Sequence, residues 1–539
     1  MRRFFYILLF TFLVCFEGTH AQNFTTVLGR PTDTSVTINI LFDTTVDVYW
    51  EYGTAGGQLA TNTPVYTAVR DSTLEINLAS LQPNTRYFYR TRYRLNGSTA
   101  SFKADSIHSF QTQRRAGTSF SFVVEADPHL DSNCNPDSYR LTLKHMLSKQ
   151  PDFLIDLGDN TMNDKLPVIN RTSIIERTLL FRNYFNELTH SVPLYITLGN
   201  HEGELGWLPN TNTSSLPTLA ALLRKTYFPN PFPNGFYSGN TVPEPYIGLR
   251  ENYYAWEWGD ALFAVIDPYI FTKSKPEWGW TLGSAQYNWL KNTLTASKAR
   301  FKFIFSHQLV GGSGTDGRGG SEFVHLYEMG GRNTDSTYGF SANRPGWYKP
   351  LHDLFIETGV NIYFHGHDHL FAKQDKDRVV YQEVPQPSAK NLQSITGTAY
   401  GYKEGTLLPN RGYMYVTVNE SQVKVDYIRT YLPSEENATR KNGDIAYSYT
   451  IQYSPVTGVH EIVNPVDVSV FPVPAHEKIY IQYPPAVRRF SYRLIDLTGK
   501  VMRSSAAREI DTSKIPPGTY LLQLTTDEIT TVRKIVVVH

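Results

Sequence analysis

Short apolar runs alternate with amphipathic stretches between about residues 118 and 430 of this chain. The apolar runs have the length and composition of buried strands, and they span residues 120–124, 153–157, 194–198, 301–305 and 361–364. Residues 138–149 and 284–296 are the clearest helices, and Ser284 can cap the second of them. Because strands and helices alternate, the sequence predicts a layered α/β domain with a β-sheet core and flanking helices.

A short polar signature follows each of these apolar runs. In order along the chain, the signatures are Asp127-Pro-His129, Gly158-Asp159-Asn160, Gly199-Asn-His-Glu202, the single His307, and Gly366-His-Asp-His369. The carboxyl ends of strands in an open α/β sheet are where ligand sites form. We therefore expect these side chains to meet at one place, although the first and last lie about 240 residues apart.

The residue types in these signatures suit a pair of divalent metal ions. Two cations about 3.5–4 Å apart need a shared carboxylate to offset their repulsion, and Asp159 is the natural bridge. Neutral imidazoles and an amide oxygen fill further positions without adding much negative charge. His367 and His369 stand two residues apart and can face different ions. A lone histidine is more often structural, so each signature alone is weak, but the ordered set of five indicates a two-metal site.

The ordered set resembles the calcineurin-like metallophosphoesterase superfamily, whose pattern is D-x-H, G-D, G-N-H-[DE], H and G-H-x-H. The resemblance implies a first metal ion held by Asp127, His129, Asp159 and His369. It implies a second metal ion held by Asp159, Asn200, His307 and His367. By the same resemblance His201 is catalytic, since it is not a ligand but reaches the leaving-group oxygen or a phosphate oxygen. Glu202 either orients His201 or simply ends the strand.

This resemblance implies an enzyme, a phosphatase or phosphodiesterase in which a metal-bound hydroxide attacks a small-molecule phosphate ester. A cyclic nucleotide or nucleotide phosphodiesterase, or a pyrophosphohydrolase, with the same site is the alternative, because fold-level similarity does not set the substrate. A non-catalytic surface binding protein is a third hypothesis, which the filled ligand positions disfavour. The glycine-rich residues 311–320 follow His307, so we expect them at the rim of the metal site. Either they form a substrate-facing loop in which Arg318 meets a phosphate, or they are a flexible surface connection.

The region before this domain is predicted to be all-β. Residues from about 23 to 113 contain alternating segments such as 35–41 and 87–93, separated by turn residues. Residues 81–87 and 109–112 resemble the tyrosine-containing turn and the last strand of a fibronectin type III-like sandwich. Similar sandwiches precede the catalytic domain in purple acid phosphatases.

One position departs from the purple acid phosphatase pattern. Those enzymes place a tyrosine ligand three residues after the aspartate of the second motif, where this chain has Met162. His129 can fill the position that the tyrosine leaves. We therefore expect no tyrosinate–iron colour, and Mn, Fe or Zn as the two divalent or trivalent metal ions.

Residues 463–539 return to short strands after an expected linker over 431–462. The segments Phe471-Pro-Val-Pro474, Asp496-Leu-Thr-Gly-Lys500 and Gly518-Thr-Tyr-Leu-Leu522 resemble the C-terminal sorting domain of type IX secretion cargo. The opening departs from that pattern, because Phe471 and Val473 replace a tyrosine and an asparagine. The resemblance implies the type IX secretion machinery as a partner, and an accessory β-sandwich such as a carbohydrate-binding module is the alternative.

The N-terminus predicts export. Two arginines precede an apolar run over residues 4–16, and a small-residue cleavage site ends at Ala21, so residues 1–21 have the pattern of a signal peptide. The mature protein is then secreted or attached to the cell surface, and no other segment is apolar enough to cross a membrane. Cys134 alone remains after cleavage, which excludes an internal disulfide. The formal net charge of +1 gives no basic excess, so we expect no nucleic-acid binding.

Overall fold

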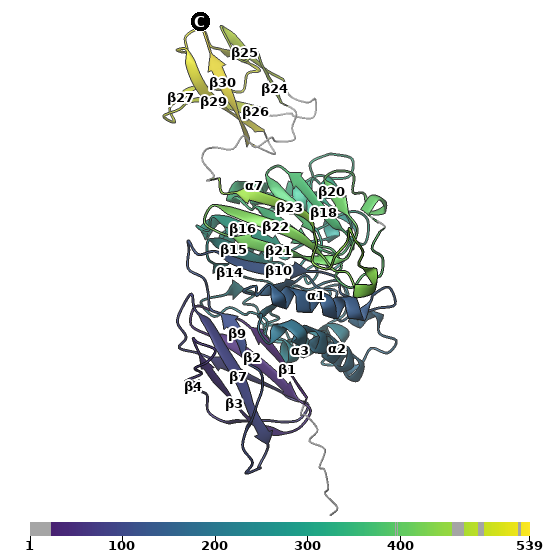
Figure 1. The fold of residues 1–539 in the computed structure, drawn as a ribbon. Coiled ribbons are helices and arrows are strands. Elements are labelled where there is room, and N and C mark those ends of the chain that lie inside the picture. Colours follow the sequence, from purple (N-terminus) through teal and green to yellow (C-terminus); the bar gives the residue numbers. More distant parts are fainter. Residues whose placement is uncertain (1–22, 394, 396, 455–467, 483–489, 527–529) are drawn as a thin grey trace, which may run out of the picture.

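The computed structural model describes residues 23–393, 395, 397–454, 468–482, 490–526 and 530–539. An N-terminal β-sandwich, a central α/β domain and a C-terminal β-sandwich follow one another along the chain, and Figure 1 shows the two sandwiches at opposite ends of the molecule. The expected signal peptide, residues 1–21, lies outside the described residues.

The N-terminal sandwich packs two antiparallel sheets around a core that contains Trp50 and Tyr89. The Tyr87 hydroxyl accepts a hydrogen bond from the Gln82 backbone N–H at 2.9 Å, which closes the tyrosine-containing turn over residues 81–87. One sheet consists of β1 (Phe24–Gly29), β2 (Val36–Phe42) and β6 (Thr73–Leu78). The other consists of β4 (Thr61–Asn62), β3 (Val46–Gly53), β7 (Arg86–Leu95), β8 (Lys103–Ala104), β5 (Tyr66–Ala68) and β9 (His108–Gln111).

Strand β2 is buried along almost its whole length, although alternating exposure was expected there. The reason is that β1 lies against helix α2 (Arg171–Thr189) of the central domain, and that Asn39 of β2 contacts Arg182 of the same helix. From α2 the fully buried Arg182 donates hydrogen bonds to the carbonyls of Thr25, Asn39 and Tyr227. The first sandwich is therefore fixed to the central domain by a buried polar contact.

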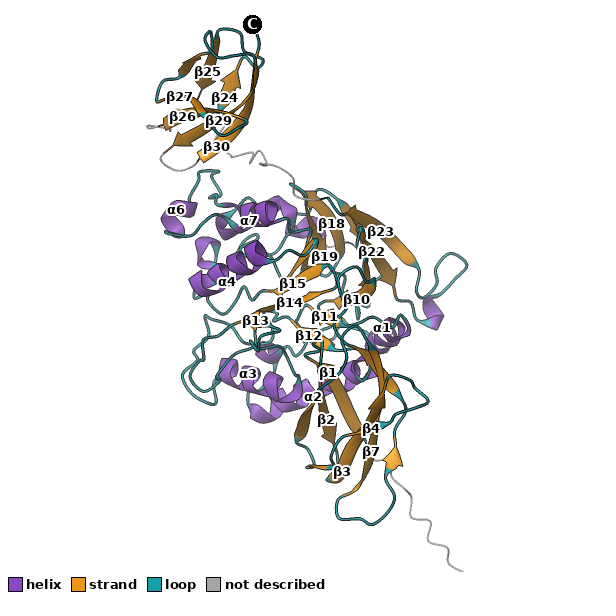
Figure 2. Ribbon diagram, turned by 90° about the vertical axis from the view of Figure 1, so that its left-hand side faces the viewer, coloured by secondary structure: helices purple, strands orange, loops and turns teal. Residues whose placement is uncertain are grey.

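The core of the central domain is a pair of sheets, with helices on both outer sides (Figure 2). The six-stranded sheet has the order β12 (Leu194–Ile196), β11 (Leu154–Asp156), β10 (Phe120–Glu125), β21 (Gly412–Val418), β22 (Gln422–Arg429) and β23 (Ile445–Gln452). The eight-stranded sheet has the order β13 (Ser238–Gly239), β14 (Tyr254–Trp258), β15 (Ala261–Val265), β16 (Phe301–Phe305), β17 (Ile362–His365), β19 (Val379–Glu383), β18 (Phe371–Lys376) and β20 (Thr406–Leu408).

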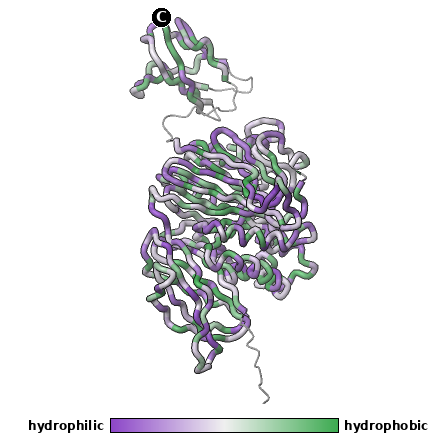
Figure 3. The backbone as a smooth tube through the Cα atoms, in the orientation of Figure 1, coloured by the Kyte–Doolittle hydropathy of each residue, from purple (hydrophilic) through white to green (hydrophobic). Residues whose placement is uncertain are grey.

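Aromatic side chains fill the space between the two sheets. Phe122 of the first sheet packs against Phe263, Phe303 and Phe364 of the second. Figure 3 shows hydrophobic segments running through these strands. The prediction of a layered α/β domain with a β-sheet core and flanking helices is confirmed, and the structure adds that the core is two stacked sheets.

Helices cover the outer face of each sheet. Helices α1 (Pro136–Ser148), α2 and α3 (Leu216–Tyr227) pack on the six-stranded sheet, and α4 (Gly283–Ala296) and α7 (Leu351–Thr358) pack on the eight-stranded one. Short turns of helix make up the rest: α5 (Tyr327–Gly330), α6 (Phe340–Asn343), η1 (Asn163–Lys165), η2 (Glu277–Gly279), η3 (Ser321–Phe323), η4 (Gly397–Tyr400) and η5 (Pro433–Glu435). Among the described residues, no helix combines the length and the apolarity needed to cross a membrane.

Two sequence-based expectations are wrong in this domain. The segment 431–462 is not a linker throughout, because β23 pairs antiparallel with β22 and completes the six-stranded sheet. Tyr447, Tyr449 and Ile451 of β23 alternate toward the core between the sheets, as in a half-buried strand. Ser284 does not cap α4, since Leu282 stands at the cap position and makes no side-chain cap bond.

The C-terminal sandwich has a hydrophobic core of its own, which includes Ile479, Leu494 and Ile535. In its turn over residues 496–500, the Asp496 carboxylate accepts from the backbone N–H groups of Thr498 and Lys500 at 2.9 and 3.0 Å. The two sheets consist of β24 (Ser469–Phe471), β25 (Lys478–Gln482) and β28 (Glu509–Asp511), and of β27 (Val501–Ser505), β26 (Phe490–Asp496), β29 (Gly518–Thr526) and β30 (Thr530–Val537).

Candidate metal centre

The five signatures converge at the carboxyl ends of parallel strands in both sheets. Strands β10, β11 and β12 of the six-stranded sheet lead into the first three signatures, and β16 and β17 of the eight-stranded sheet lead into the last two. The turns are tight, with a φ between +45° and +80° at Asp127, His129, Asp159, His367 and His369. A left-handed backbone at non-glycine residues is uncommon and gathers at functional sites.

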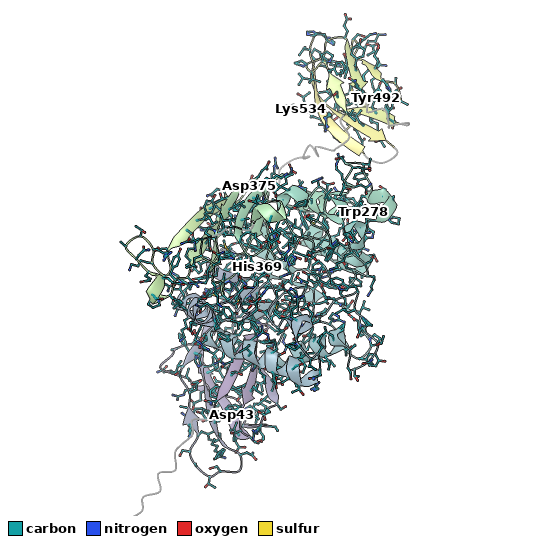
Figure 4. The ribbon with its side chains drawn as sticks, turned by 90° about the vertical axis from the view of Figure 1, so that its right-hand side faces the viewer. Asp43, Trp278, His369, Asp375, Tyr492 and Lys534 are labelled. Atoms are coloured by element: carbon teal, nitrogen blue, oxygen red, sulfur yellow. The ribbon has the colours of Figure 1, made fainter. Side chains whose placement is uncertain are left out.

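Three of the expected ligands form a first cluster around Asp127 Oδ1. His129 Nε2 lies 3.6 Å from this oxygen and His369 Nε2 lies 3.5 Å from it. His129 Nε2 is also 3.6 Å from Asp159 Oδ2. Figure 4 shows His369 within the central domain, far from the C-terminal sandwich residues Tyr492 and Lys534.

A second cluster adjoins the first and consists of Asp159, His307 and His367. His307 Nε2 lies 3.2 Å from Asp159 Oδ2 and 3.7 Å from Asp127 Oδ1. His307 Nδ1 lies 2.9 Å from the Leu157 carbonyl oxygen, which can only accept, so Nδ1 carries a proton and Nε2 is the nitrogen that faces the cluster. Asp159 faces the histidines of both clusters, as a bridging ligand must.

Buried atoms without hydrogen-bond partners mark the same place. Among the described residues, Asp127 Oδ1, His129 Nε2, His307 Nε2 and Asn200 Oδ1 are buried and have no such partner. A buried polar atom left unpaired costs about 1–3 kcal/mol, so four of them together need a ligand. Oxygen and imidazole donors in this arrangement fit metal ions, and the residues present therefore fit the pair of ions that the sequence predicts.

His201 lies beside the clusters and is held by a residue that the sequence did not identify. Its Nδ1 lies 2.9 Å from the Asp164 carboxylate, and its Nε2 lies 3.9 Å from Asp159 Oδ2. Asp164 stands on η1, in the loop after the second signature, where no regular spacing points to it. An acidic residue that follows one of the signatures was the available signal, and such residues are too common to single one out.

Glu202 does neither of the two things expected of it. Its buried carboxylate accepts hydrogen bonds from the backbone N–H groups of Gly199, Asp159 and Asn160, at 2.6 to 2.9 Å. Glu202 thus ties the second and third signatures together, and Asp164, rather than Glu202, orients His201.

Comparisons with known proteins agree with this geometry. Residues 120–371 match the family model of the calcineurin-like phosphoesterases, and residues 469–538 match that of the secretion system C-terminal sorting domain. The central domain is a calcineurin-like phosphoesterase. The chain is therefore a metal-dependent phosphoester hydrolase, and the sorting domain indicates export through a type IX secretion system. The resemblances to the calcineurin-like metallophosphoesterases and to the secretion sorting domain are confirmed. No curated protein matches the chain in sequence.

Solved structures share the fold of this phosphoesterase at low sequence identity. A structure of PhoD is 16% identical with a TM-score of 0.57, and the match covers 80% of this chain and 90% of that one. The purple acid phosphatase PPD1 from yellow lupin (Lupinus luteus) seeds is 16% identical with a TM-score of 0.52, and the match covers 79% of this chain and 74% of that one. These likenesses show the fold alone.

The charges of the phosphoesterase site depend on its imidazoles. Burial lowers the pKa of His307, but the Asp159 and Asp127 carboxylates outweigh burial and raise this pKa to about 9. Burial acts to raise the pKa values of Asp127 and Asp159, but the adjacent histidines hold both well below the usual range. In the metal-free protein a proton on His307 thus balances the carboxylates, and a bound metal ion would supply that positive charge instead.

Met162 is buried three residues after Asp159, in the loop that leads to η1. The neighbouring first cluster contains His129. The absence of a visible tyrosinate band from the iron-loaded protein stays a prediction, to be checked by absorption spectra before and after reduction.

Proposed function

We propose that this chain is an exported phosphohydrolase that cleaves small-molecule phosphate esters at a pair of metal ions. The observation that carries the proposal is the joining by Asp159 of two clusters of possible metal ligands, around which four buried polar atoms have no hydrogen-bond partner. Asp127, His129, Asp159 and His369 would hold the first ion, and Asp159, Asn200, His307 and His367 the second. When bound, such a pair polarises a phosphate ester and lowers the pKa of water.

The chain's own residues supply orientation and a proton. Glu202 fixes the turns that carry Asp159 and Asn200, and the Leu157 carbonyl fixes the tautomer of His307. The Asp164 carboxylate accepts from His201 Nδ1 and thereby turns Nε2 toward the clusters, so Nε2 is the atom that would deliver a proton to the leaving-group oxygen. His201 is partly exposed, with 18% of its side chain accessible, and a substrate can therefore reach it.

We expect the enzyme to act outside the cell. The sorting domain over residues 469–538 supports a secreted or cell-surface location and an interaction with the type IX secretion machinery. The signal peptide over residues 1–21 would deliver the chain to that pathway.

The test is hydrolysis by the mature chain, residues 22–539, loaded with Mn²⁺ or Zn²⁺. The substrates are p-nitrophenyl phosphate and its bis ester, each with and without a chelator. Chelator-sensitive turnover supports the proposal, and the ratio of the two rates separates a monoesterase from a diesterase. Absence of turnover together with absence of bound metal would contradict it and favour a binding protein.

A further inference from the structure

The glycine-rich segment 311–320 packs against the turn that carries His367. The Asp316 carbonyl oxygen lies 3.0 Å from His367 Nε2. A carbonyl oxygen can only accept, so Nε2 carries the proton and the lone pair stands on Nδ1. The contact therefore sets the tautomer and the ring orientation in which His367 offers Nδ1 to the second cluster.

Arg318 fastens this segment to the turn. Its Nη1 donates to the His367 carbonyl at 2.8 Å and to Asp368 Oδ1 at 3.0 Å. The Gly319 backbone N–H donates to the other carboxylate oxygen of Asp368 at 2.7 Å. The Arg318 guanidinium lies 4.4 Å from the centre of the Tyr400 ring, which adds a cation–π contact.

Asp368 is anchored from the opposite side as well. The Tyr402 hydroxyl donates to its carboxylate at 3.0 Å, and the Asp368 backbone N–H donates to Glu383 Oε1 at 2.9 Å. Only 2% of the Asp368 side chain is exposed, and a buried carboxylate needs charged or hydrogen-bonding partners. The pairing with Arg318 therefore joins the glycine-rich segment and the His367 turn into one unit.

Close packing requires a glycine at position 317 of this segment. Gly317 has a φ of +72°, and a Cβ there would stand 2.0 Å from Gln308 Nε2. The Ser313 N–H donates to the Arg318 carbonyl at 2.8 Å and closes the segment into a turn. Packing and hydrogen bonds thus hold residues 313–319 in one path, which argues against a flexible connection.

We propose that Arg318 and Asp368 are a positioning pair that holds the Asp316 carbonyl on His367 and thereby sets the affinity of the second metal position. This inference rests on the proposed function only in taking His367 as a metal ligand. It assigns Arg318 a role through His367 rather than a contact with the substrate phosphate. Removal of the outer partner of a metal-binding histidine typically weakens metal affinity about 10- to 100-fold.

The experiment is calorimetric titration of the metal-free mature chain with Mn²⁺, with the bound ions counted by mass spectrometry. Arg318→Ala should weaken the second binding event about 10- to 100-fold and leave the first unchanged. Arg318→Lys should lie between, because an ammonium group keeps the charge but loses the contact of the planar guanidinium with the Tyr400 ring. Asp316→Ala is the matched control, since its side chain is exposed and the contact uses its backbone carbonyl, so it should bind as the wild type does.

Unchanged affinities in Arg318→Ala would overturn the inference, and a rise in KM alone would instead assign Arg318 to the substrate. If Arg318→Ala does not fold, Asp368→Asn is tested in its place, because this substitution keeps the shape of the turn. The same loss is expected of it, and wild-type affinities would again overturn the inference. A wild type that binds two Mn²⁺ ions but hydrolyses neither ester contradicts the proposed function and leaves this inference standing. A wild type that binds fewer than two overturns both.

Discussion

His201 and Asp164 form a contact at the edge of the site whose role is separable from metal binding. His201 Nδ1 is engaged by Asp164, and its Nε2 is 3.9 Å from the nearer Asp159 oxygen. The residue therefore lies close enough to assist a reacting group without completing either cluster.

His201→Ala should keep both metal ions and lower kcat about 10²- to 10⁴-fold, the usual contribution of a positioned acid or base. Metal content by mass spectrometry and kcat for p-nitrophenyl phosphate test this together. Asp164→Asn is the companion variant, and it should lower kcat less, because the imidazole remains. Loss of metal from His201→Ala would show that His201 is a ligand instead.

Metal binding should strengthen as the pH rises toward 9. The pKa of His307 is about 9 in the metal-free protein, and its Nε2 must lose the proton to accept a metal ion. Below pH 9 the apparent affinity of the second position should fall about tenfold per pH unit for this one proton. Titrations with Mn²⁺ at pH 6.5, 7.5 and 8.5 measure the slope, and a flat profile would contradict the assignment of His307.

The stability of the metal-free protein should change with pH in the opposite direction. The folded-state pKa of His307 is raised above the unfolded value of about 6.5, so its contribution to the free energy of unfolding is complete below pH 6.5. That contribution is lost as the pH rises through about 9. Chemical denaturation of the chelator-treated protein at several pH values between 6.5 and about 9 measures this loss in the free energy of unfolding.

At the scale of the elements, helix α2 joins the first sandwich to the phosphoesterase domain. Arg182→Ala would leave buried carbonyl oxygens of Thr25, Asn39 and Tyr227 without their donor. We expect a loss of about 3 kcal/mol in the free energy of unfolding. Arg171→Ala, an exposed position on the same helix, is the control and should cost less than about 0.5 kcal/mol. Equal effects of the two substitutions would contradict the structural role of Arg182.

The strands that carry the site were predictable because each is a buried apolar run that ends in a polar signature. The residues that hold the signatures in place were not predictable from the sequence. Asp164 and Arg318 act through loops, where neither period nor spacing identifies a partner, and Glu202 binds backbone N–H groups from two turns that only the fold brings together. Strand β23 was missed although Tyr447, Tyr449 and Ile451 alternate, because a polar, turn-rich segment separates it from β22.

At the scale of the whole molecule, two truncations test the corrected boundary. A chain that ends at residue 454 keeps β23 and removes a sandwich with its own core, so the phosphoesterase domain should keep its Tm and its kcat. A chain that ends at residue 430 loses β23 and leaves β22 as an uncovered edge, which favours aggregation. Soluble yield and thermal unfolding distinguish the two. Equal behaviour of the two chains would restore the segment 431–454 as a linker.

The ligands of the proposed metal pair come from both stacked sheets, with Asp127 and Asp159 on one and His307 and His369 on the other. A metal pair held there is a cross-link that closes a loop of about 240 residues, the kind of constraint whose stabilisation grows with loop length. Cys134 is the one cysteine among the described residues, and it is buried and unpaired there, so those residues contain no disulfide cross-link. Outside the cell, the protein's resistance to unfolding should therefore track the supply of metal ions rather than the redox state of its surroundings.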